Sequence, residues 1–301
     1  FTWNTASLFG SMSSSAARAA AKMALARRLL SSSAVLFLQE TLGTAGDLAT
    51  LPNTHIHFWP FLLPDEVAGA SRAGGVVTSI HKTIIDKIGC ISERVLSAGR
   101  CLAIWLEGPG IDIILINVHL NPQWTFIQKK FVLIAIAKNI KIHSSSIVLL
   151  GGDWNFVHSD DRRFDIESAT ETASSDPIAQ AFENIFADLV ELAQPNYTRA
   201  NSMLAPTAAL KTLSRIDRLY TNVPPADLHD LLVQVGTVRS VLDCNRPSDH
   251  LPVSARLSRP PPRLGHARIP NHIVTHPSFS KHLTALSSND LIAMNMNTNE
   301  A

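Results

Sequence analysis

The chain has 301 residues, of which 46% are hydrophobic and 17% are charged, a composition that excludes a disordered protein and suffices for one large domain or two small ones. The formal net charge of +1 excludes a global attraction to nucleic acid, so any polyanion would have to bind local clusters of Lys and Arg. The longest compact apolar run, FVLIAIA at 131–137, is far shorter than the roughly 20 residues of a membrane span, so we expect no transmembrane segment and no membrane partner.

The first forty residues fit two interpretations. Residues 1–39 contain no Asp or Glu but four cations among many Ser and Ala, which is typical of a mitochondrial transit peptide. The competing pattern is a strand at 1–4, an Ala-rich helix at 13–30 and an apolar strand at 34–40. A β-α-β opening explains the segment without targeting, and we favour it. Because the chain starts at Phe1 and not at Met, we expect it to have been cut from a longer protein.

Apolar runs separated by turn residues predict most of the remaining elements. Strands are predicted over 74–80, 82–91, 100–107, 110–120, 144–153, 215–222, 230–238 and 250–257. Helices are predicted over 123–143 and 176–194. Strands outnumber helices, and several follow one another directly. This order favours an α/β sandwich with mixed sheets over a regular doubly wound sheet.

The composition changes after Leu257. We predict a folded domain over 1–257 and a Pro/Arg/His-containing linker or tail over 258–301 that is partly disordered. Four cations of this tail could follow a phosphate backbone, although a solvated segment is the expected role: Arg259, Arg263, Arg268 and Lys281.

Polar side chains stand at the ends of many predicted strands. They are Asn4, Glu40, His119, Asp153, Asn155, Asp217, Asp249 and His250. A single Asp or Asn after a strand is usually a turn or cap residue. Eight such groups favour a functional role, because strand ends on one rim of a sheet converge in space. The set therefore predicts a catalytic site.

Hydrolysis of a phosphate ester fits these residue types. Mg²⁺ takes hard oxygen ligands, often from only one or two carboxylates, and Glu40 is a candidate ligand. Asp153 could activate or aim the attacking water, while Asp217 would hold His250 in one tautomer and raise its basicity. Three further groups would donate hydrogen bonds to phosphoryl oxygens: Asn4, His119 and Asn155.

The ordered motifs around these residues resemble those of the endonuclease/exonuclease/phosphatase superfamily. The motifs are WN at 3–4, QE at 39–40, NVHL at 117–120, GDWN at 152–155, RID at 215–217 and SDH at 248–250. The resemblance covers about residues 1–257. It implies a four-layered α/β sandwich with two central mixed β-sheets flanked by helices, and a Mg²⁺- or Mn²⁺-dependent phosphoesterase site at one edge.

The resemblance also implies a role for each residue. The metal-side residues would be Asn4, Glu40 and Asp249. The catalytic residues would be His119, Asp153, Asn155, Asp217 and His250. Among these, Asp153 and Asn155 would position the nucleophilic water and the phosphate, His119 would contact the phosphate or the leaving group, and Asp217 would orient His250.

Departures from the family patterns narrow the branch. The abasic-site repair branch typically has Tyr where His119 stands and an acid where Ala6 stands, and SRIDR lacks the P-A-W-C-D-R pattern of phosphoinositide phosphatases. The chain most resembles the endonuclease domain of a non-LTR retrotransposon. This implies an intracellular, nuclear enzyme that nicks target DNA, with a reverse transcriptase domain in the same longer chain. The alternatives are a phosphatase or phospholipase of the same superfamily and a non-catalytic retroelement remnant.

Other polar and aromatic groups have simpler interpretations. The mixed charges at 160–163 indicate a solvated loop more than a DNA contact. Core or rim packing is expected for Trp59, Trp105 and Trp154. Cys90, Cys101 and Cys244 form no C-x-x-C pair, so the sequence indicates no disulfide framework and no zinc-thiolate site.

Overall fold

The structure is a computed structural model that describes residues 1–9, 16–60, 75–142, 146–158, 161–166, 168–173, 176–202, 210–238, 248–258 and 278. The chain divides into two compact units, Phe1–Ser258 and Arg259–Ala301. The helices and strands that follow all belong to the first unit. Apart from Ser258 and Ser278, the predicted tail lies outside the described residues, and its linker role stays a prediction.

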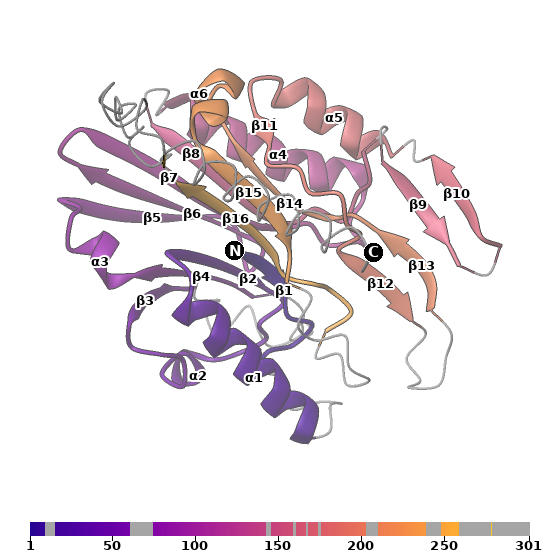
Figure 1. Cartoon of the computed structure of the whole chain (residues 1–301), viewed down its shortest axis with the longest axis horizontal. Helices are drawn as coiled ribbons and strands as arrows, with labels where there is room; N and C mark the ends of the chain where they lie inside the picture. The colour runs from indigo at the N-terminus through magenta and orange to yellow at the C-terminus, as the bar shows by residue number, and fades with distance from the viewer. Residues whose placement is uncertain are drawn as a thin grey trace. The chain divides into compact units, whose positions relative to one another are not determined.

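Two six-stranded sheets form the centre of the first unit (Figure 1). The first sheet has the order β15 (Leu232–Thr237), β16 (Val253–Ser258), β1 (Thr2–Asn4), β2 (Val35–Gln39), β4 (Val76–His81) and β3 (His55–Phe58). The second has the order β11 (Val190–Glu191), β14 (Asp217–Thr221), β8 (Ile147–Asp153), β7 (Ile111–His119), β6 (Cys101–Gly108) and β5 (Cys90–Ser97). Both sheets are mixed, because β1–β2 and β7–β8 are parallel pairs among antiparallel ones.

Strand β2 shows why the layers form. Its side chains alternate between the two faces of the sheet, as they must in an extended chain. Leu36 and Leu38 pack in a core cluster with Leu25 and Leu29 of helix α1 (Ala16–Ser31), while Phe37 belongs to a different cluster that contains residues of both sheets. Each fully buried Leu or Phe contributes about 1.5–3 kcal/mol. Alternation along β2 therefore joins a helix layer to the first sheet and the first sheet to the second.

The outer face of the second sheet is covered by α4 (Phe126–Ile142) and α5 (Pro177–Ile185), which pack in one core cluster with β6, β7 and β8 (Figure 1). Trp105 and Trp154 lie in this cluster, which confirms their predicted core packing. Helix, sheet, sheet and helix layers follow one another, so the predicted four-layered α/β sandwich is confirmed. The β-α-β opening is confirmed as well, since α1 connects the parallel strands β1 and β2.

A third, four-stranded sheet was not predicted. Its order is β10 (Thr170–Ala173), β9 (Arg162–Asp165), β13 (Leu210–Ser214) and β12 (Arg199–Ser202). The charged segment at 160–163 therefore enters a strand, and the prediction of a solvated loop was wrong for Asp161. This carboxylate is half-buried between the guanidinium groups of Arg215 and Arg218, while Asp160 lies outside the described residues.

Two predicted elements were wrong in part. Residues 82–91 begin with a short helix, α3 (Lys82–Ile85), because the His81 side chain accepts a hydrogen bond from the Thr83 amide and caps it; strand β5 starts only at Cys90. The helix predicted over 176–194 ends at Ile185, since Val190–Glu191 pairs with β14 as β11. Two further short helices were not predicted, α2 (Ala45–Leu48) and α6 (Pro225–Asp230). None of the helices in the described ranges has both the length and the apolar character that crossing a membrane requires.

Candidate active site

The polar strand ends meet at one edge of the two central sheets. Asn4 ends β1, and Glu40 follows β2 in the parallel neighbour. In the second sheet His119 and Asp153 end the parallel strands β7 and β8 and stand opposite each other, and Asp217 opens β14 opposite Asp153. Strand ends that are far apart in sequence are thus brought together by strand order.

The glycine pair before Asp153 allows this close approach. A Cβ atom on Gly151 would lie 2.7 Å from the Phe37 ring, which belongs to the first sheet. A Cβ atom on Gly152 would lie 1.8 Å from the carbonyl oxygen of Val118 in the neighbouring strand β7. Any side chain at these positions would push β8 away from its neighbours. The two glycines therefore serve to deliver Asp153 to the edge where the sheets meet.

Left-handed backbone conformations occur at several of these strand ends. Glu40 has φ of 52°, Asn155 49° and Ala6 46°, values that cost non-glycine residues free energy and persist where the surroundings determine them. Two are supported by side-chain turns: Asp153 Oδ1 accepts from the Asn155 amide at 3.0 Å, and Asn4 Oδ1 accepts from the Ala6 amide at 2.9 Å. The chain bends sharply where it presents polar groups.

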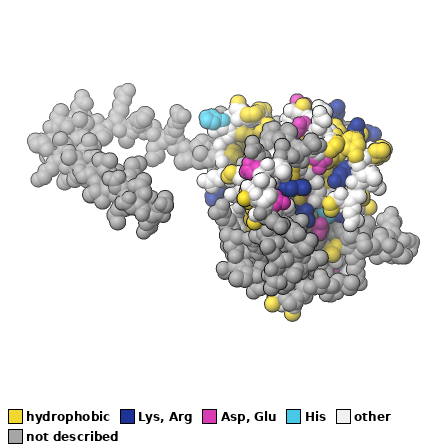
Figure 2. Space-filling model, turned by 90° about the vertical axis from the view of Figure 1, so that its right-hand side faces the viewer, with side chains coloured by type: hydrophobic (Ala, Val, Ile, Leu, Met, Phe, Trp, Pro, Cys, Tyr) yellow, Lys and Arg dark blue, Asp and Glu magenta, His cyan; other side chains and the backbone are white. Residues whose placement is uncertain are grey.

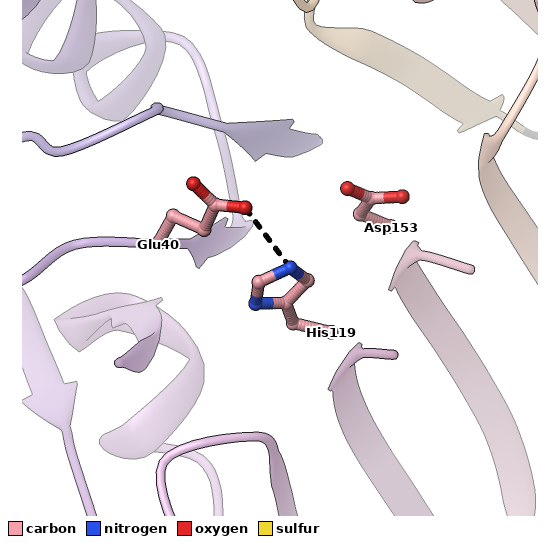
Figure 3. Close-up of side chains that lie close together, drawn as sticks. All are labelled: Glu40, His119 and Asp153. Carbon is pink, nitrogen blue, oxygen red and sulfur yellow. Dashed lines mark ion pairs between the residues drawn. The ribbon is translucent and has the colours of Figure 1, made fainter. Parts of the chain in front are cut away.

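Glu40 is held by two donors. His119 Nε2 lies 3.0 Å from Glu40 Oε1, and Asn4 Nδ2 donates to the same oxygen at 3.2 Å. Figure 3 shows Glu40, His119 and Asp153 projecting from three strand ends toward a common space. Burial acts to raise the pKa of Glu40, but the hydrogen bonds of His119 and Asn4 outweigh it and lower the pKa to about 2. This carboxylate is ionised at neutral pH.

His250 forms a buried pair with Asp217. Its Nδ1 donates to Asp217 Oδ2 at 2.8 Å, while its Nε2 lies 3.9 Å from Asp153 Oδ2. Burial acts to lower the pKa of His250, but the negative charges of Asp217 and Asp153 outweigh it and raise the pKa to about 10. The imidazole is therefore protonated at neutral pH and presents an N–H on the side of Asp153.

Asp153 lies between the Glu40–His119 pair and the Asp217–His250 pair. Its Oδ2 accepts from Asn4 Nδ2 at 2.8 Å, and the same oxygen faces His250. Burial raises the pKa of Asp153 and the charge of Asp217 adds to this effect, while His250 acts in the opposite direction. The ligand atoms of two groups converge among the described residues, Glu40–His119–Asp153 and Asp153–Asp217–His250, and Asp153 belongs to both.

The remaining two predicted residues are placed differently. Asn155 lies beside Asp153, and its side-chain amide donates to the carbonyl oxygen of Leu120 at 2.8 Å. Asp249 is 31% exposed and pairs with Arg199, whose Nε lies 3.2 Å from Asp249 Oδ2. Asp249 lies 3.9 Å from His250 Nε2 and in neither converging group. The structure therefore gathers the predicted residues around Asp153 and leaves Asp249 at the rim.

Sequence reasoning missed three basic residues of this site. Arg100 Nη1 lies 2.7 Å from His119 Nδ1 and 3.5 Å from Nε2, and Arg199 pairs with Asp249. Lys22, buried in α1, donates to two backbone carbonyls of the loop after β1. Each acts on a partner at least 15 residues away in the sequence, so no local pattern marks it.

The chain matches a sequence family and shares its fold with several solved structures. A sequence model of the Endonuclease/Exonuclease/phosphatase family matches residues 1–250. No curated protein sequence matches the chain.

Three solved structures illustrate the structural likeness. An AP endonuclease from Leishmania major is 16% identical, with a TM-score of 0.62 over 86% of this chain and 87% of that one. A 3′-5′ exonuclease from Neisseria meningitidis is 19% identical, with a TM-score of 0.57 over 85% and 98% of the two chains. The endonuclease domain of TRAS1, a telomere-specific non-LTR retrotransposon, is 13% identical, with a TM-score of 0.55 over 85% and 96%. At these identities the likeness shows the fold alone.

Proposed function

The chain belongs to the endonuclease/exonuclease/phosphatase family, and from this premise we propose that it is a Mg²⁺- or Mn²⁺-dependent phosphodiesterase that nicks DNA. The observation that carries the proposal is the position of Asp153, which lies between the ionised Glu40 and the protonated His250. A phosphodiesterase needs a metal site, a group that takes a proton from water and a cation for the developing phosphoryl charge. All three lie within reach of this one carboxylate.

The donor set fits a hard divalent cation. Glu40 and Asp153 are carboxylates, and both contacts of the Glu40 side chain with donors among the described residues fall on Oε1. Burial raises the pKa of Asp153 and the charge of Asp217 adds to this effect, so a cation beside Asp153 would stabilise its ionised form. We assign Glu40 as the principal ligand, with Asn4 orienting both Glu40 and Asp153. When bound, such an ion would polarise a phosphoryl oxygen and neutralise negative charge.

Asp153 and His250 are the residues that we assign to proton transfer and to stabilisation of the phosphoryl charge. Asp153 is suited to take the proton of the attacking water, because burial raises its pKa and the Asn155 amide holds its Oδ1. His250 is suited to stabilise the phosphoryl oxygens, because its Nδ1 is fixed by Asp217 and its Nε2 is left to donate. Asp249, which the sequence placed on the metal side, would then act at the rim together with Arg199.

DNA is the substrate that we favour. Arg100 and Arg199 place two guanidinium groups beside the carboxylates, where a phosphate backbone would need them. The face seen from the right-hand side of Figure 1 mixes Lys and Arg with Asp and Glu, so attraction to DNA would come from such local cations (Figure 2). From the sequence motifs we further propose target nicking for retrotransposition, in the nucleus and with a reverse transcriptase domain in a longer chain; the endonuclease domain of the TRAS1 retrotransposon shares the fold that this requires.

Nicking of supercoiled plasmid tests the proposal. We expect conversion to open circles with Mg²⁺ or Mn²⁺, none with EDTA, and a loss of about 10²- to 10³-fold in His250→Ala, because the donor to the phosphoryl oxygens is gone. His229→Ala, a change of the same type on the exposed surface of α6, serves as the matched control and should nick like the parent.

Turnover of other phosphodiesters separates the alternatives. The parent protein is compared on duplex DNA, a phosphoinositide and sphingomyelin under the same metal conditions. Faster turnover of either lipid would favour a phosphatase or phospholipase of the family. A folded protein that turns over none of the three would be a non-catalytic remnant, and the proposal would be abandoned.

A further inference from the structure

The inner faces of β2 and β7 change from apolar to polar just before the strand ends that form the site. On β7, Ile113 and Leu115 pack in a core cluster with residues of the first sheet, and the next residue on that face is Asn117. On β2, Phe37 belongs to the same cluster and is followed on its face by Gln39. Both amide side chains are fully buried. Buried polar groups are hydrogen-bonded in stable proteins, so the partners of these amides decide what they do.

The two amides form a bridge between the sheets. Gln39 Nε2 donates to Asn117 Oδ1 at 2.7 Å. Asn117 Nδ2 donates in turn to two main-chain carbonyl oxygens of the first sheet, to Leu38 at 3.2 Å and to Val77 at 2.9 Å. Carbonyl oxygens only accept hydrogen bonds, so these partners fix the orientation of the Asn117 amide. Three hydrogen bonds thus tie one residue of β7 to β2 and β4 of the other sheet.

The bridge adjoins two groups of the candidate active site. Glu40 is the residue after Gln39, and His119 lies two residues after Asn117 on the same face of β7. His119 Nε2 and Glu40 Oε1 meet at 3.0 Å, although they come from different sheets. Apolar packing between the sheets is not directional, whereas a hydrogen bond is. The bridge therefore fixes the end of β2 relative to the end of β7.

We propose that Gln39 and Asn117 are positioning residues, whose buried bridge sets the relative position of β2 and β7 and so holds Glu40 and His119 in place for a divalent cation and a phosphate. The cation and the phosphate rest on the proposed function, whereas the bridge does not. A displacement of about 1 Å near the reacting groups can lower a rate by about 10²-fold. Loss of the bridge should therefore weaken metal binding and turnover even where the fold remains stable.

Apolar replacement of both partners separates positioning from core stability. Gln39→Met and Asn117→Leu each keep the approximate size of the side chain, but each single change leaves the other amide without a partner. The double variant removes both polar groups, so its urea midpoint should exceed that of the less stable single variant. Its kcat for plasmid nicking should still be about 10²-fold below that of the parent, with KM for DNA near the parent value.

Affinity for Mn²⁺, measured by the electron paramagnetic resonance signal of the free ion, is a readout that a purely structural bridge would leave unchanged. We expect the double variant to bind Mn²⁺ about 10- to 100-fold more weakly than the parent, as when a residue that orients a metal ligand is lost. Thr78→Val is the matched control. Thr78 pairs with Phe37 on the same buried face, and its hydroxyl has no hydrogen-bond partner among the described residues, so this variant should bind Mn²⁺ like the parent.

A double variant that keeps the Mn²⁺ affinity of the parent within about twofold would overturn the proposal. If the double variant does not fold, Gln39→Met alone supplies the comparison, because it breaks the bridge but keeps both bonds of Asn117 to the first sheet. An equal loss of affinity in Thr78→Val would also overturn the proposal, since any change on this face would then act on the site. A parent that binds Mn²⁺ but does not nick DNA would contradict the proposed function and leave the positioning result intact, whereas a parent that binds no Mn²⁺ would overturn both.

Discussion

Two buried charge clusters begin at consecutive residues of β14, and they differ in whether their charges balance. Arg218 belongs to the arginine cluster, which consists of Asp161, Glu191, Arg215 and Arg218. Asp217 belongs to the strand-end cluster, which consists of Glu40, His119, Asp153, Asp217 and His250. Successive residues of a strand point to opposite faces, so one strand supplies both clusters.

The arginine cluster is complete in itself. Its two carboxylates meet two guanidinium groups, and Arg215 lies 2.6 Å from Asp161 and 3.0 Å from Glu191. Burial acts to raise the pKa of Asp161, but the hydrogen bonds of Arg215 and the charge of Arg218 outweigh it and lower the pKa. Such a cluster has no electrostatic need of a ligand. It joins the chain after β8 to β11 and β14.

The strand-end cluster is not complete. Its three carboxylates are contacted by two imidazoles and the Asn4 amide, and only one of these groups, the imidazole of His250, carries a positive charge; Arg100 and Lys22 act on Glu40 through space. Burial raises the pKa of Asp153, and carboxylate charge at this depth is costly unless a cation joins it. The comparison teaches that burial of charge alone does not mark a site; a buried cluster whose carboxylates outnumber the cations in contact with them does.

The largest expected effect is a loss of nicking activity when the strand-end cluster is changed. Asp153→Asn should lower nicking about 10⁴-fold, comparable to the loss of an orienting or proton-accepting carboxylate in other hydrolases. Its free energy of unfolding should change by no more than about 1 kcal/mol, because relief of a buried charge offsets the acceptor lost to the amide. Plasmid nicking and urea unfolding measure the two quantities. A stability loss as large as that of an Arg218 variant would contradict the distinction between the clusters.

The second effect is on stability, in the other cluster. Arg218→Met should lower the free energy of unfolding by about 1–3 kcal/mol, because two half-buried carboxylates lose the hydrogen bonds of a buried guanidinium and keep only those of Arg215. Urea unfolding at neutral pH measures the loss, with Arg163→Met in the exposed part of β9 as the control. At a temperature where the variant remains folded, nicking per folded molecule should fall by less than about tenfold. Unchanged stability would show that the arginine cluster does not hold the fold together.

The third effect concerns the cation. Mn²⁺ at about 100 times its Kd should raise the free energy of unfolding of the parent by about 2.7 kcal/mol, since only the folded protein offers the site. The increment should disappear in Glu40→Gln and persist in Glu191→Gln, which changes the balanced cluster. Calorimetric melting with and without Mn²⁺ measures it. An increment that is lost in Glu191→Gln but kept in Glu40→Gln would reverse the assignment of the clusters.

The two clusters also differ in how far the sequence predicts them. The strand-end residues follow apolar runs such as AVLFLQE and IVLLGGD, so hydrophobic pattern and strand order were enough to expect Glu40 and Asp153 at one edge. The arginine cluster depends on β11 and on the chain near β9, where 176–194 looked like one helix and 160–163 like a loop. Tertiary ion pairs and pairing of short polar strands decide those segments. The contact of Arg100 with His119 was unpredictable for the same reason.

The last effect is a dependence of stability on pH. Folding raises the pKa of His250 from an ordinary value of 6.5 to about 10, so the folded protein keeps a proton that the unfolded chain releases. The stabilisation is complete below pH 6.5 and is lost as the pH rises from about 6.5 to about 10, with a slope on the order of 1 kcal/mol per pH unit. Asp217→Asn removes the charge that contributes most to the raised pKa, so the slope in this window should become shallower, as measured by urea midpoints between pH 6 and 10.

Asp161→Asn is the matched change in the balanced cluster. Because the pKa of Asp161 is lowered, its contribution is lost only in acid, and the alkaline slope of that variant should equal that of the parent. Equal alkaline slopes in the parent and in Asp217→Asn would mean that the His250 imidazolium does not contribute to the free energy of unfolding. The proton would then lie on another residue of the strand-end cluster.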